Sequence, residues 1–208
     1  MTLLNLLTMQ LKPANNPLRR ARWPLLWLGP LLAILLPFCL SCQAEEIDPE
    51  LKAKLMQAVA EADSFVDEFD AQVWLMQKSA VLERFVKDPD DRLFLLRHIH
   101  REAKRADLPP EFVLAVIQVE SHFDQFALSR VGARGLMQIM PFWKNEIGRE
   151  TDNLMHIETN LRYGCTILKH YLERANGNWA EALARYNGSY GKIWYAEKVM
   201  VAWQKNWR

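Results

Sequence analysis

The sequence has few of the residues that mark disulfide-rich, redox or metal-binding proteins. It contains three cysteines in 208 residues, and Cys39 and Cys42 lie inside an apolar stretch near the N-terminus. If that stretch is removed, Cys165 has no internal disulfide partner, and its place on an apolar helix face predicts a small core residue. His98 and His100 would point to different faces of a helix, so they lack metal-ligand spacing. We therefore expect no disulfide framework, no metal and no cofactor.

The sequence also lacks a strong charge of either sign. Its formal net charge is +1, which argues against a nucleic-acid partner. The charges are unevenly distributed, because residues 1–44 carry four basic residues and no acid, whereas the rest of the chain carries 22 basic and 25 acidic residues. This asymmetry is typical of an export signal followed by a globular domain.

Residues 1–44 have the parts of a signal peptide. Arginines within 19–22 precede an apolar run over 25–40, and small residues ending at Ala44 follow it. The run is interrupted by glycine and proline and is shorter than the roughly 20 residues that a membrane-spanning helix needs. Cleavage after Ala44 would give a periplasmic protein. An uncleaved anchor, or lipid attachment at Cys42, would instead keep the N-terminus at the membrane, and the sequence leaves these three interpretations open.

The rest of the chain has a helical pattern, without internal repeats or low-complexity tracts. From Pro49 to about Val86, apolar residues recur at alternating steps of four and three, which predicts one long helix packed lengthwise on a partner. The pattern lasts about three heptads, which favours packing within the chain over a coiled-coil dimer, so we expect a monomer. Residues 87–91 break the pattern and separate a helical segment, 45–90, from a second domain, 91–208. The predicted seam consists of Leu55, Val59, Ala62, Val66, Phe69, Val73 and Met76.

Residues 91–208 have the pattern of short helices joined by Gly, Pro or Asn connections. A glycine-containing loop with an apolar run occupies 129–140, and Pro141 starts a short helix. We therefore predict a mainly α fold with at most a very small sheet. The longer helices are expected over residues 91–105, 109–121, 157–175, 178–186 and 192–205.

One acidic residue continues a hydrophobic stripe. Between residues 112 and 119 only Gln118 is polar, which predicts a helix buried on most sides. A carboxylate on this helix would lose water, and desolvation raises its pKa. A glutamate with a raised pKa holds a proton near neutral pH, as a general acid for glycosidic cleavage must. The stripe is formed by Val113, Val116, Ile117 and Glu120.

Two later segments offer groups that would complete a ligand site. Gly132 and Gly135 let the backbone approach a ligand, and the amide of Gln138 has both donor and acceptor groups for sugar substituents. Tyr186 and Asn187 place a phenol and an amide at a helix end. Each segment alone also fits ordinary turn chemistry.

Taken in order, these segments resemble the lysozyme-like transglycosylase domain of the soluble lytic transglycosylases. The resemblance covers about residues 91–208, and its glycine-containing stretch is the most specific part. The motifs are Glu120-Ser121-x-Phe123, Gly132-Ala133-x-Gly135-Leu136-Met137-Gln138-Ile139-Met140-Pro141, Asn160-Leu161-x-x-Gly164 and Ala182-Leu183-x-x-Tyr186-Asn187-Gly188.

The resemblance implies a lysozyme-like helical fold whose groove holds peptidoglycan strands of alternating N-acetylglucosamine and N-acetylmuramic acid. It implies that Glu120 protonates the glycosidic oxygen and then accepts a proton from the muramic acid 6-hydroxyl, leaving a 1,6-anhydro end. It also implies supporting roles for five residues. Ser121 would fix Glu120 or the substrate, and Met137 and Gln138 would line the groove. Tyr186 would form a hydrogen bond near Glu120, and Asn187 would support the site.

The matching motifs contain one acid, whereas ordinary glycosidases use two carboxylates. Asp124 lies one turn beyond Glu120, where the family commonly has asparagine, so we expect a positional role for it. Three further acids occur in a polar loop region and are expected to be solvated: Glu146, Glu150 and Asp152.

Two residues depart from the family pattern. Gln125 replaces a usual proline, and Arg185 stands where alanine is usual. Arg185 would either contact a carboxylate of a peptide stem or face solvent, and we favour solvent. These departures bear on subsite preference rather than on the chemistry.

Two other functions fit the same residues. A lysozyme on this scaffold would deliver water to C1 of the sugar, and its product would be heavier by one water than the anhydro product. A non-catalytic glycan-binding or scaffold protein would use the groove, or the heptad stripe, without cleaving anything.

Overall fold

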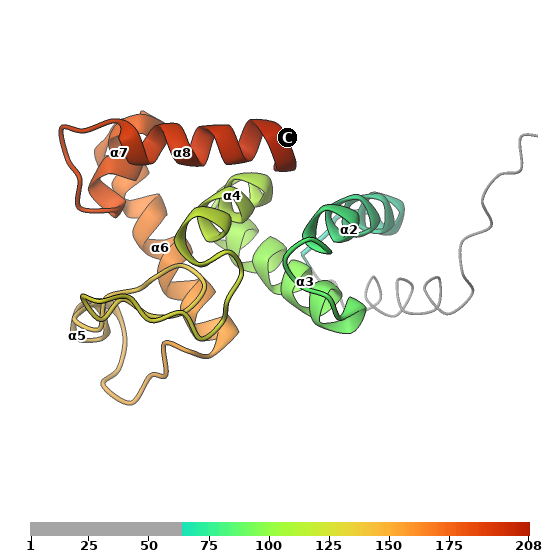
Figure 1. Cartoon of the computed structure of the whole chain (residues 1–208), viewed down its shortest axis with the longest axis horizontal. Helices are drawn as coiled ribbons and strands as arrows, with labels where there is room; N and C mark the ends of the chain where they lie inside the picture. Colours follow the sequence, from blue (N-terminus) through green and yellow to red (C-terminus); the bar gives the residue numbers. More distant parts are fainter. Residues whose placement is uncertain (1–63) are drawn as a thin grey trace, which may run out of the picture. The chain divides into compact units, whose positions relative to one another are not determined.

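A computed structural model describes residues 64–208, and nearly all of its regular structure is helical (Figure 1). In this range the β pairing consists of isolated bridges from Arg134 to Leu128 and to Ile139. The predicted mainly α fold with at most a very small sheet is therefore confirmed. The helices are α2 (Glu68–Leu82), α3 (Pro89–Arg105), α4 (Pro110–Ser121), α5 (Trp143–Ile147), α6 (Ile157–Arg174), α7 (Trp179–Tyr186), α8 (Trp194–Ala202) and the π-turn η1 (Trp203–Trp207).

The expected signal segment, 1–44, lies outside the described residues, as do Leu55, Val59 and Ala62 of the predicted seam. Among residues 64–208, no helix combines the length and the apolar character required to cross a bilayer.

Side-chain caps set where several helices begin. The Asp88 carboxylate accepts the backbone N–H groups of Asp90 and Asp91, and Pro89 occupies the first turn of α3. A carboxylate or amide oxygen at this position satisfies donors that have no partner within the helix. Asn178 caps α7 in the same way, through the N–H of Glu181. Helix α3 therefore begins at Pro89, two residues before the start that the sequence predicted at residue 91.

The prediction of one continuous helix from Pro49 to Val86 is wrong. Residues 64–67 are not helical, because Asp67 caps the start of α2 by accepting the N–H groups of Phe69 and Asp70. The predicted seam is also misplaced. Val66, Phe69 and Met76 are exposed, whereas α2 buries Ala71, Leu75, Lys78, Ser79 and Leu82.

Helix α2 packs against α3 and η1. The Trp74 indole N–H donates to the Glu111 carboxylate at the start of α4 at 2.5 Å. The buried Lys78 ammonium donates to the Trp207 carbonyl at the C-terminal end at 2.7 Å. These polar contacts bind α2 to two elements far along the chain, so this helix braces the fold from the side.

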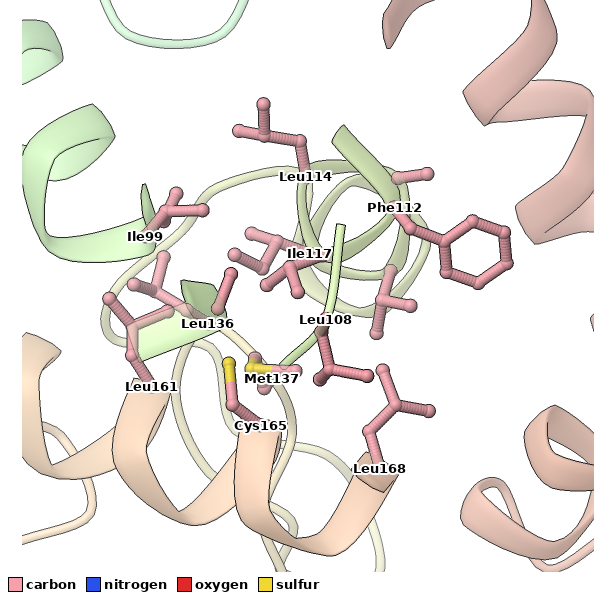
Figure 2. Packing of buried hydrophobic residues seen from close by; sticks show 14 of the residues in the cluster. Ile99, Leu108, Phe112, Leu114, Ile117, Leu136, Met137, Leu161, Cys165 and Leu168 are labelled. Atoms are coloured by element: carbon pink, nitrogen blue, oxygen red, sulfur yellow. The ribbon is translucent and has the colours of Figure 1, made fainter. Parts of the chain in front are cut away.

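Helix α4 lies between α3 and α8 and forms the centre of the core (Figure 1). Its residues Leu114 and Ile117 have no exposed surface and pack with side chains of α3 and α6 (Figure 2). Gln118, the polar exception on this helix, accepts hydrogen bonds from the Trp207 indole at 2.8 Å and from Asn206 at 3.0 Å. The apolar run therefore fixes α4 rigidly, which matters because Glu120 stands at its last turn.

Cys165 lies in the same core, as predicted, and burial raises the pKa of its thiol far above the usual range. Beside it, the Glu102 carboxylate is fully buried and pairs with Arg105 at 2.6 Å and Arg162 at 2.9 Å. Burial alone would raise the pKa of Glu102, but the two guanidiniums hold it below its usual value. The ion pair between Glu102 and Arg162 joins α3 to α6.

Candidate active site

Glu120 is the partly buried carboxyl group at the C-terminal turn of α4. The Tyr195 hydroxyl, from α8, donates a hydrogen bond to Glu120 Oε1 at 2.5 Å. Burial raises the pKa of the Glu120 carboxyl to about 7, although the hydrogen bond from Tyr195 acts in the opposite direction. The predicted desolvation of this side chain is therefore present, and the group is suited to give and take a proton near neutral pH.

Glu120 opens into a cleft of about 230 Å³. The cleft is bounded by the end of α4, the loop before α5, and parts of α5, α6 and α7. Glu120 is the only carboxylate among the residues that line it. They are Glu120, Ser129, Val131, Ala133, Gln138, Ile139, Met140, Trp143, Ile167, Tyr186 and Asn187.

A larger hollow of about 500 Å³ lies elsewhere, beside Arg105, Asp152 and Tyr163. Its acid, Asp152, accepts the Tyr163 hydroxyl at 2.6 Å, and this contact holds the pKa of Asp152 below its usual value. A carboxyl group in that state holds no proton at neutral pH. The chemistry of a general acid therefore belongs to the smaller cleft, and the expectation that Asp152 is simply solvated is wrong.

Part of the cleft wall is formed by the glycine-containing loop, residues 129–140. Gly135 has a φ of +73°, and a Cβ there would lie 2.5 Å from the Asn160 amide nitrogen. Asn160 in turn accepts the Met137 N–H and donates to the carbonyls of Arg134 and Leu154, each at 2.8 Å. Gly135 and Asn160 are therefore both needed to hold this loop closely against α6.

Four of the six predicted site residues line the cleft: Glu120, Gln138, Tyr186 and Asn187. The Gln138 amide nitrogen is directed back to the loop, where it donates to the carbonyls of Ala127 and Gly135. The Tyr186 hydroxyl donates to the Met137 carbonyl at 2.8 Å rather than to Glu120. Tyr186 therefore supports the wall of the cleft, and the hydrogen bond to Glu120 comes from Tyr195.

The other two predicted residues do not reach the cleft. The Met137 side chain has no exposed surface, and Figure 2 shows it in the core with Cys165. It packs against Gly164, where a Cβ would lie 2.2 Å from the Met137 sulfur. The Ser121 hydroxyl is buried and donates back to the Ile117 carbonyl at 3.2 Å. The prediction that Met137 lines the groove is therefore wrong. The Ser121 hydroxyl bonds within its own helix rather than to Glu120, and its predicted role toward the substrate stays a prediction.

Two hydroxyl-bearing residues at the site were missed. Tyr195 is 75 residues from Glu120 along the chain, in a helix whose sequence gave no sign of a contact with Glu120. Ser129 lines the cleft, and its hydroxyl accepts the Ala133 N–H at 2.9 Å. Asp124 has the expected positional role, because its carboxylate accepts the Phe126 N–H at 2.8 Å.

Together the fold and the site define a helical domain with a carboxyl group of raised pKa in a cleft. Residues 97–205 match the family described as the Transglycosylase SLT domain, and the chain belongs to this family.

Several known proteins are similar to the chain. The membrane-bound lytic murein transglycosylase F of Desulfosudis oleivorans is 35% identical over 107 residues, covering 49% of this chain and 23% of that protein. The soluble lytic murein transglycosylase of Escherichia coli is 25% identical over 136 residues, covering 60% of this chain and 21% of that protein. The chain thus spans less than a quarter of the length of these relatives.

Among solved structures, an inactive mutant of the lytic transglycosylase Slt from Pseudomonas aeruginosa is 23% identical. The superposition has a TM-score of 0.43 and covers 71% of this chain and 31% of the Slt chain.

Removing the Tyr195 hydroxyl is expected to move the pH dependence of the glycan cleavage that we propose below. In Tyr195→Phe the carboxylate of Glu120 loses its hydrogen bond, so the pKa of Glu120 rises further. Because the reacting form of the acid is protonated, the alkaline limb of kcat/KM should move up by about one pH unit. The measurement is a pH profile of glycan cleavage.

Tyr186→Phe is the matched control. It removes another buried tyrosine hydroxyl, one bonded to the Met137 carbonyl rather than to Glu120. We expect its rate to fall without movement of the alkaline limb. If both variants keep the wild-type profile, Tyr195 does not govern the protonation of Glu120.

Proposed function

We propose that this domain is a lytic transglycosylase that cleaves the bond between N-acetylmuramic acid and N-acetylglucosamine in peptidoglycan without adding water. The observation that carries the proposal is the partly buried Glu120, whose pKa is about 7, in a cleft lined by no second carboxylate. The family to which residues 97–205 belong supports the same reaction.

Each step of the reaction has a group to perform it. Glu120 donates its proton to the glycosidic oxygen, and the bond from this oxygen to C1 of the muramic acid breaks. The 6-hydroxyl of the same sugar then attacks C1, and its proton passes to the Glu120 carboxylate. The enzyme is thereby returned to its starting state, and the glycan ends in a 1,6-anhydro ring.

A single carboxyl group is sufficient for these steps, whereas hydrolytic glycosidases ordinarily need two. Retaining enzymes use the second carboxylate as nucleophile, and inverting enzymes use it to activate water. Asp124 and Asp152 bond to the Phe126 N–H and the Tyr163 hydroxyl, and neither lines the cleft. The intramolecular hydroxyl takes the place of the missing group.

The proposed substrate is a polymer of the bacterial cell wall, so the proposal includes export of the chain to the periplasm. It also includes action as a monomer, because every residue given a role belongs to one chain.

The test is digestion of purified sacculi followed by mass analysis of the soluble fragments. Wild-type protein should release muropeptides with 1,6-anhydro ends, each lighter by one water than the hydrolytic product. Fragments with reducing ends would instead identify a hydrolase. Binding without release of fragments would identify a non-catalytic glycan-binding protein.

A further inference from the structure

The hollow of about 500 Å³ beside Arg105, Asp152 and Tyr163 has no role in the proposed reaction. Three guanidinium groups line it, those of Arg105 at the end of α3, Arg149 in the loop after α5, and Arg162 on α6. Among the residues of 64–208 that line it, one carries a carboxylate, Asp152. Sites for small molecules in proteins have volumes of about 300–1,000 Å³. The hollow is therefore large enough for an organic anion.

Two of these guanidiniums are fixed from behind by a buried carboxylate. Glu102, whose side chain has no exposed surface, pairs with Arg105 Nε at 2.6 Å and with Arg162 Nη2 at 2.9 Å. Arg105 Nη2 also donates to the Thr166 hydroxyl at 2.8 Å. The side chains of Arg105 and Arg162 are 42% and 63% exposed. A ligand in the hollow would therefore meet the guanidiniums, while the carboxylate that orients them stays covered.

The positive charge of this group exceeds its negative charge by one. Arg105 and Arg162 share the single charge of Glu102. Arg149 is matched by Asp152, whose Oδ1 lies 3.3 Å from the guanidinium Nε. Three guanidiniums are thus set against two carboxylates, and one positive charge is left for a ligand.

Neighbouring charges do not cancel this excess. Arg101 pairs with Glu158 at 3.7 Å, and together they add one charge of each sign. Arg185, at the end of α7, shows the opposite case. Glu181 pairs with it one to one at 2.7 Å, and the side chain is only partly exposed, rather than facing solvent as expected. An arginine with a carboxylate of its own has no net charge to offer, whereas the shared carboxylate leaves one in the hollow.

The carboxylate that lines the hollow is already occupied by donors. Asp152 Oδ2 accepts the Tyr163 hydroxyl at 2.6 Å and the Arg149 backbone N–H at 3.1 Å. A Cβ at Gly148 would overlap the Tyr163 hydroxyl, so glycine is needed there for this contact. The Asp152 side chain is 15% exposed, whereas that of Arg149 is 82% exposed. The acid is therefore largely covered, and the basic group beside it is open.

A second hollow of about 390 Å³ adjoins the first, because Arg105 and Thr166 line both. In it the Lys169 ammonium pairs with Asp107 at 2.9 Å and with Glu173 at 3.8 Å, so this hollow has no positive excess of its own. It presents both donors and acceptors of hydrogen bonds, which suit the hydroxyl groups of a ligand.

We propose that the two hollows bind a phosphate ester of a polyol, with the phosphate at Arg105, Arg149 and Arg162 and the hydroxyl groups beside Lys169. Guanidinium donors match phosphate oxygens in geometry, and a phosphate monoester carries a charge of about −1.5 to −2 at pH 7. The simplest such group is glycerol phosphate, either free or as the headgroup of a phospholipid. The hollows share no lining residue with the cleft, so the site is independent of the proposed reaction.

The test is isothermal titration calorimetry of the wild-type protein at low ionic strength. Glycerol 3-phosphate should bind with a Kd of about 0.1–1 mM, and inorganic phosphate about threefold more weakly. Glycerol, which has no charge, should give no measurable heat. Cosedimentation with phosphatidylglycerol vesicles tests the lipid source. Binding to these vesicles without binding of the soluble ester would identify the headgroup as the ligand, and the reverse result would identify the free ester.

Three variants assign the binding to the hollow. Arg149→Ala removes the most exposed of the three guanidiniums and should weaken binding by about tenfold. Asp152→Asn removes a negative charge and should tighten binding by about threefold. Arg174→Ala is the matched control, because Arg174 is an exposed arginine about 18 Å farther along α6 than Arg162 and lines neither hollow. It should change the Kd by less than about twofold.

Two results would overturn the site. The first is the absence of binding both to the soluble phosphates and to the vesicles, which needs no variant. The second is an equal loss in Arg149→Ala and Arg174→Ala, which would show attraction by surface charge in general. Because Asp152→Asn is expected to strengthen binding, its gain cannot be produced by a damaged fold, and a loss of binding in this variant would also contradict the proposal.

Discussion

Glu120→Gln is expected to lower the rate of glycan cleavage by about a thousandfold, because glutamine cannot donate a proton to the leaving oxygen. The amide is nearly the same size as the carboxyl group, so the cleft and the contact with Tyr195 should survive. The rate is measured as release of soluble fragments from sacculi at pH 6, where Glu120 is largely protonated given a pKa of about 7.

The same substitution should stabilise the fold at high pH. The folded-state pKa of Glu120 lies above the value of the unfolded chain, so folding favours the protonated form. Stability from this group is fully present below about pH 4.5 and is lost as the pH rises through about 7. Since Glu120 is partly exposed, solvent reduces the cost, and the gain in Glu120→Gln at pH 8 should be about 2 kcal/mol.

Glu146→Gln is the matched control, because Glu146 is an exposed glutamate of α5. It should leave both the rate and the pH dependence of stability unchanged. A Glu120→Gln protein that still cleaves at a tenth of the wild-type rate would show that another group supplies the proton.

The position of Glu120 could be predicted because its helix is unusually uniform. In a small helical protein, a helix as apolar as α4 must lie at the centre of the core. A carboxyl group at the end of that helix is therefore partly desolvated. The same reasoning located Cys165 in the core. These predictions depend on local periodicity, which the sequence records directly.

Contacts between distant segments could not be predicted in this way. Tyr195 approaches Glu120 because α8 packs on α4, and nothing in the sequence around Tyr195 records that packing. The error with Met137 has a different cause. Met137 and Gln138 are neighbours in a turn that has neither helical nor strand periodicity, so the sequence could not show that Gln138 lines the cleft while Met137 enters the core.

The error in α2 came from giving weight to large apolar residues. Its buried face includes Ala71 and Ser79, small side chains that let helices approach closely but contribute little to a hydrophobic pattern. The large residues Phe69 and Met76 are more conspicuous in the sequence, yet they are exposed. Asp67 also ends the apparent periodicity, because an N-cap fixes the helix start.

Asn160→Ala is expected to destabilise the fold by about 3–5 kcal/mol, although it removes only a small side chain. Asn160 is 1% exposed, and its amide bonds the Met137 N–H and the carbonyls of Arg134 and Leu154. Without it, the Met137 N–H and the Leu154 carbonyl lose their partner in the interior, whereas the Arg134 carbonyl keeps the N–H of Ile139. Each unsatisfied group costs about 1–3 kcal/mol. Equilibrium unfolding in urea measures the difference.

The loss should extend to catalysis, because the same amide holds the loop that faces Glu120. The Tyr186 hydroxyl donates a hydrogen bond to the Met137 carbonyl, and Asn160 accepts a hydrogen bond from the N–H of the same residue. A displaced loop would misplace the sugar relative to the acid, so kcat should fall by about tenfold or more under conditions where the variant is folded.

Asn153→Ala is the control, because Asn153 is exposed and its side chain accepts one N–H, that of Met155. Its cost should stay below about 1 kcal/mol. Asn160→Asp separates the two halves of the amide, since it keeps the acceptor for Met137 but presents an oxygen to the carbonyls of Arg134 and Leu154. If Asn160→Asp matches the wild type, the Met137 contact alone holds the loop. If Asn160→Ala is as stable and as active as the wild type, the loop is held by the packing of Met137 against Gly164 instead.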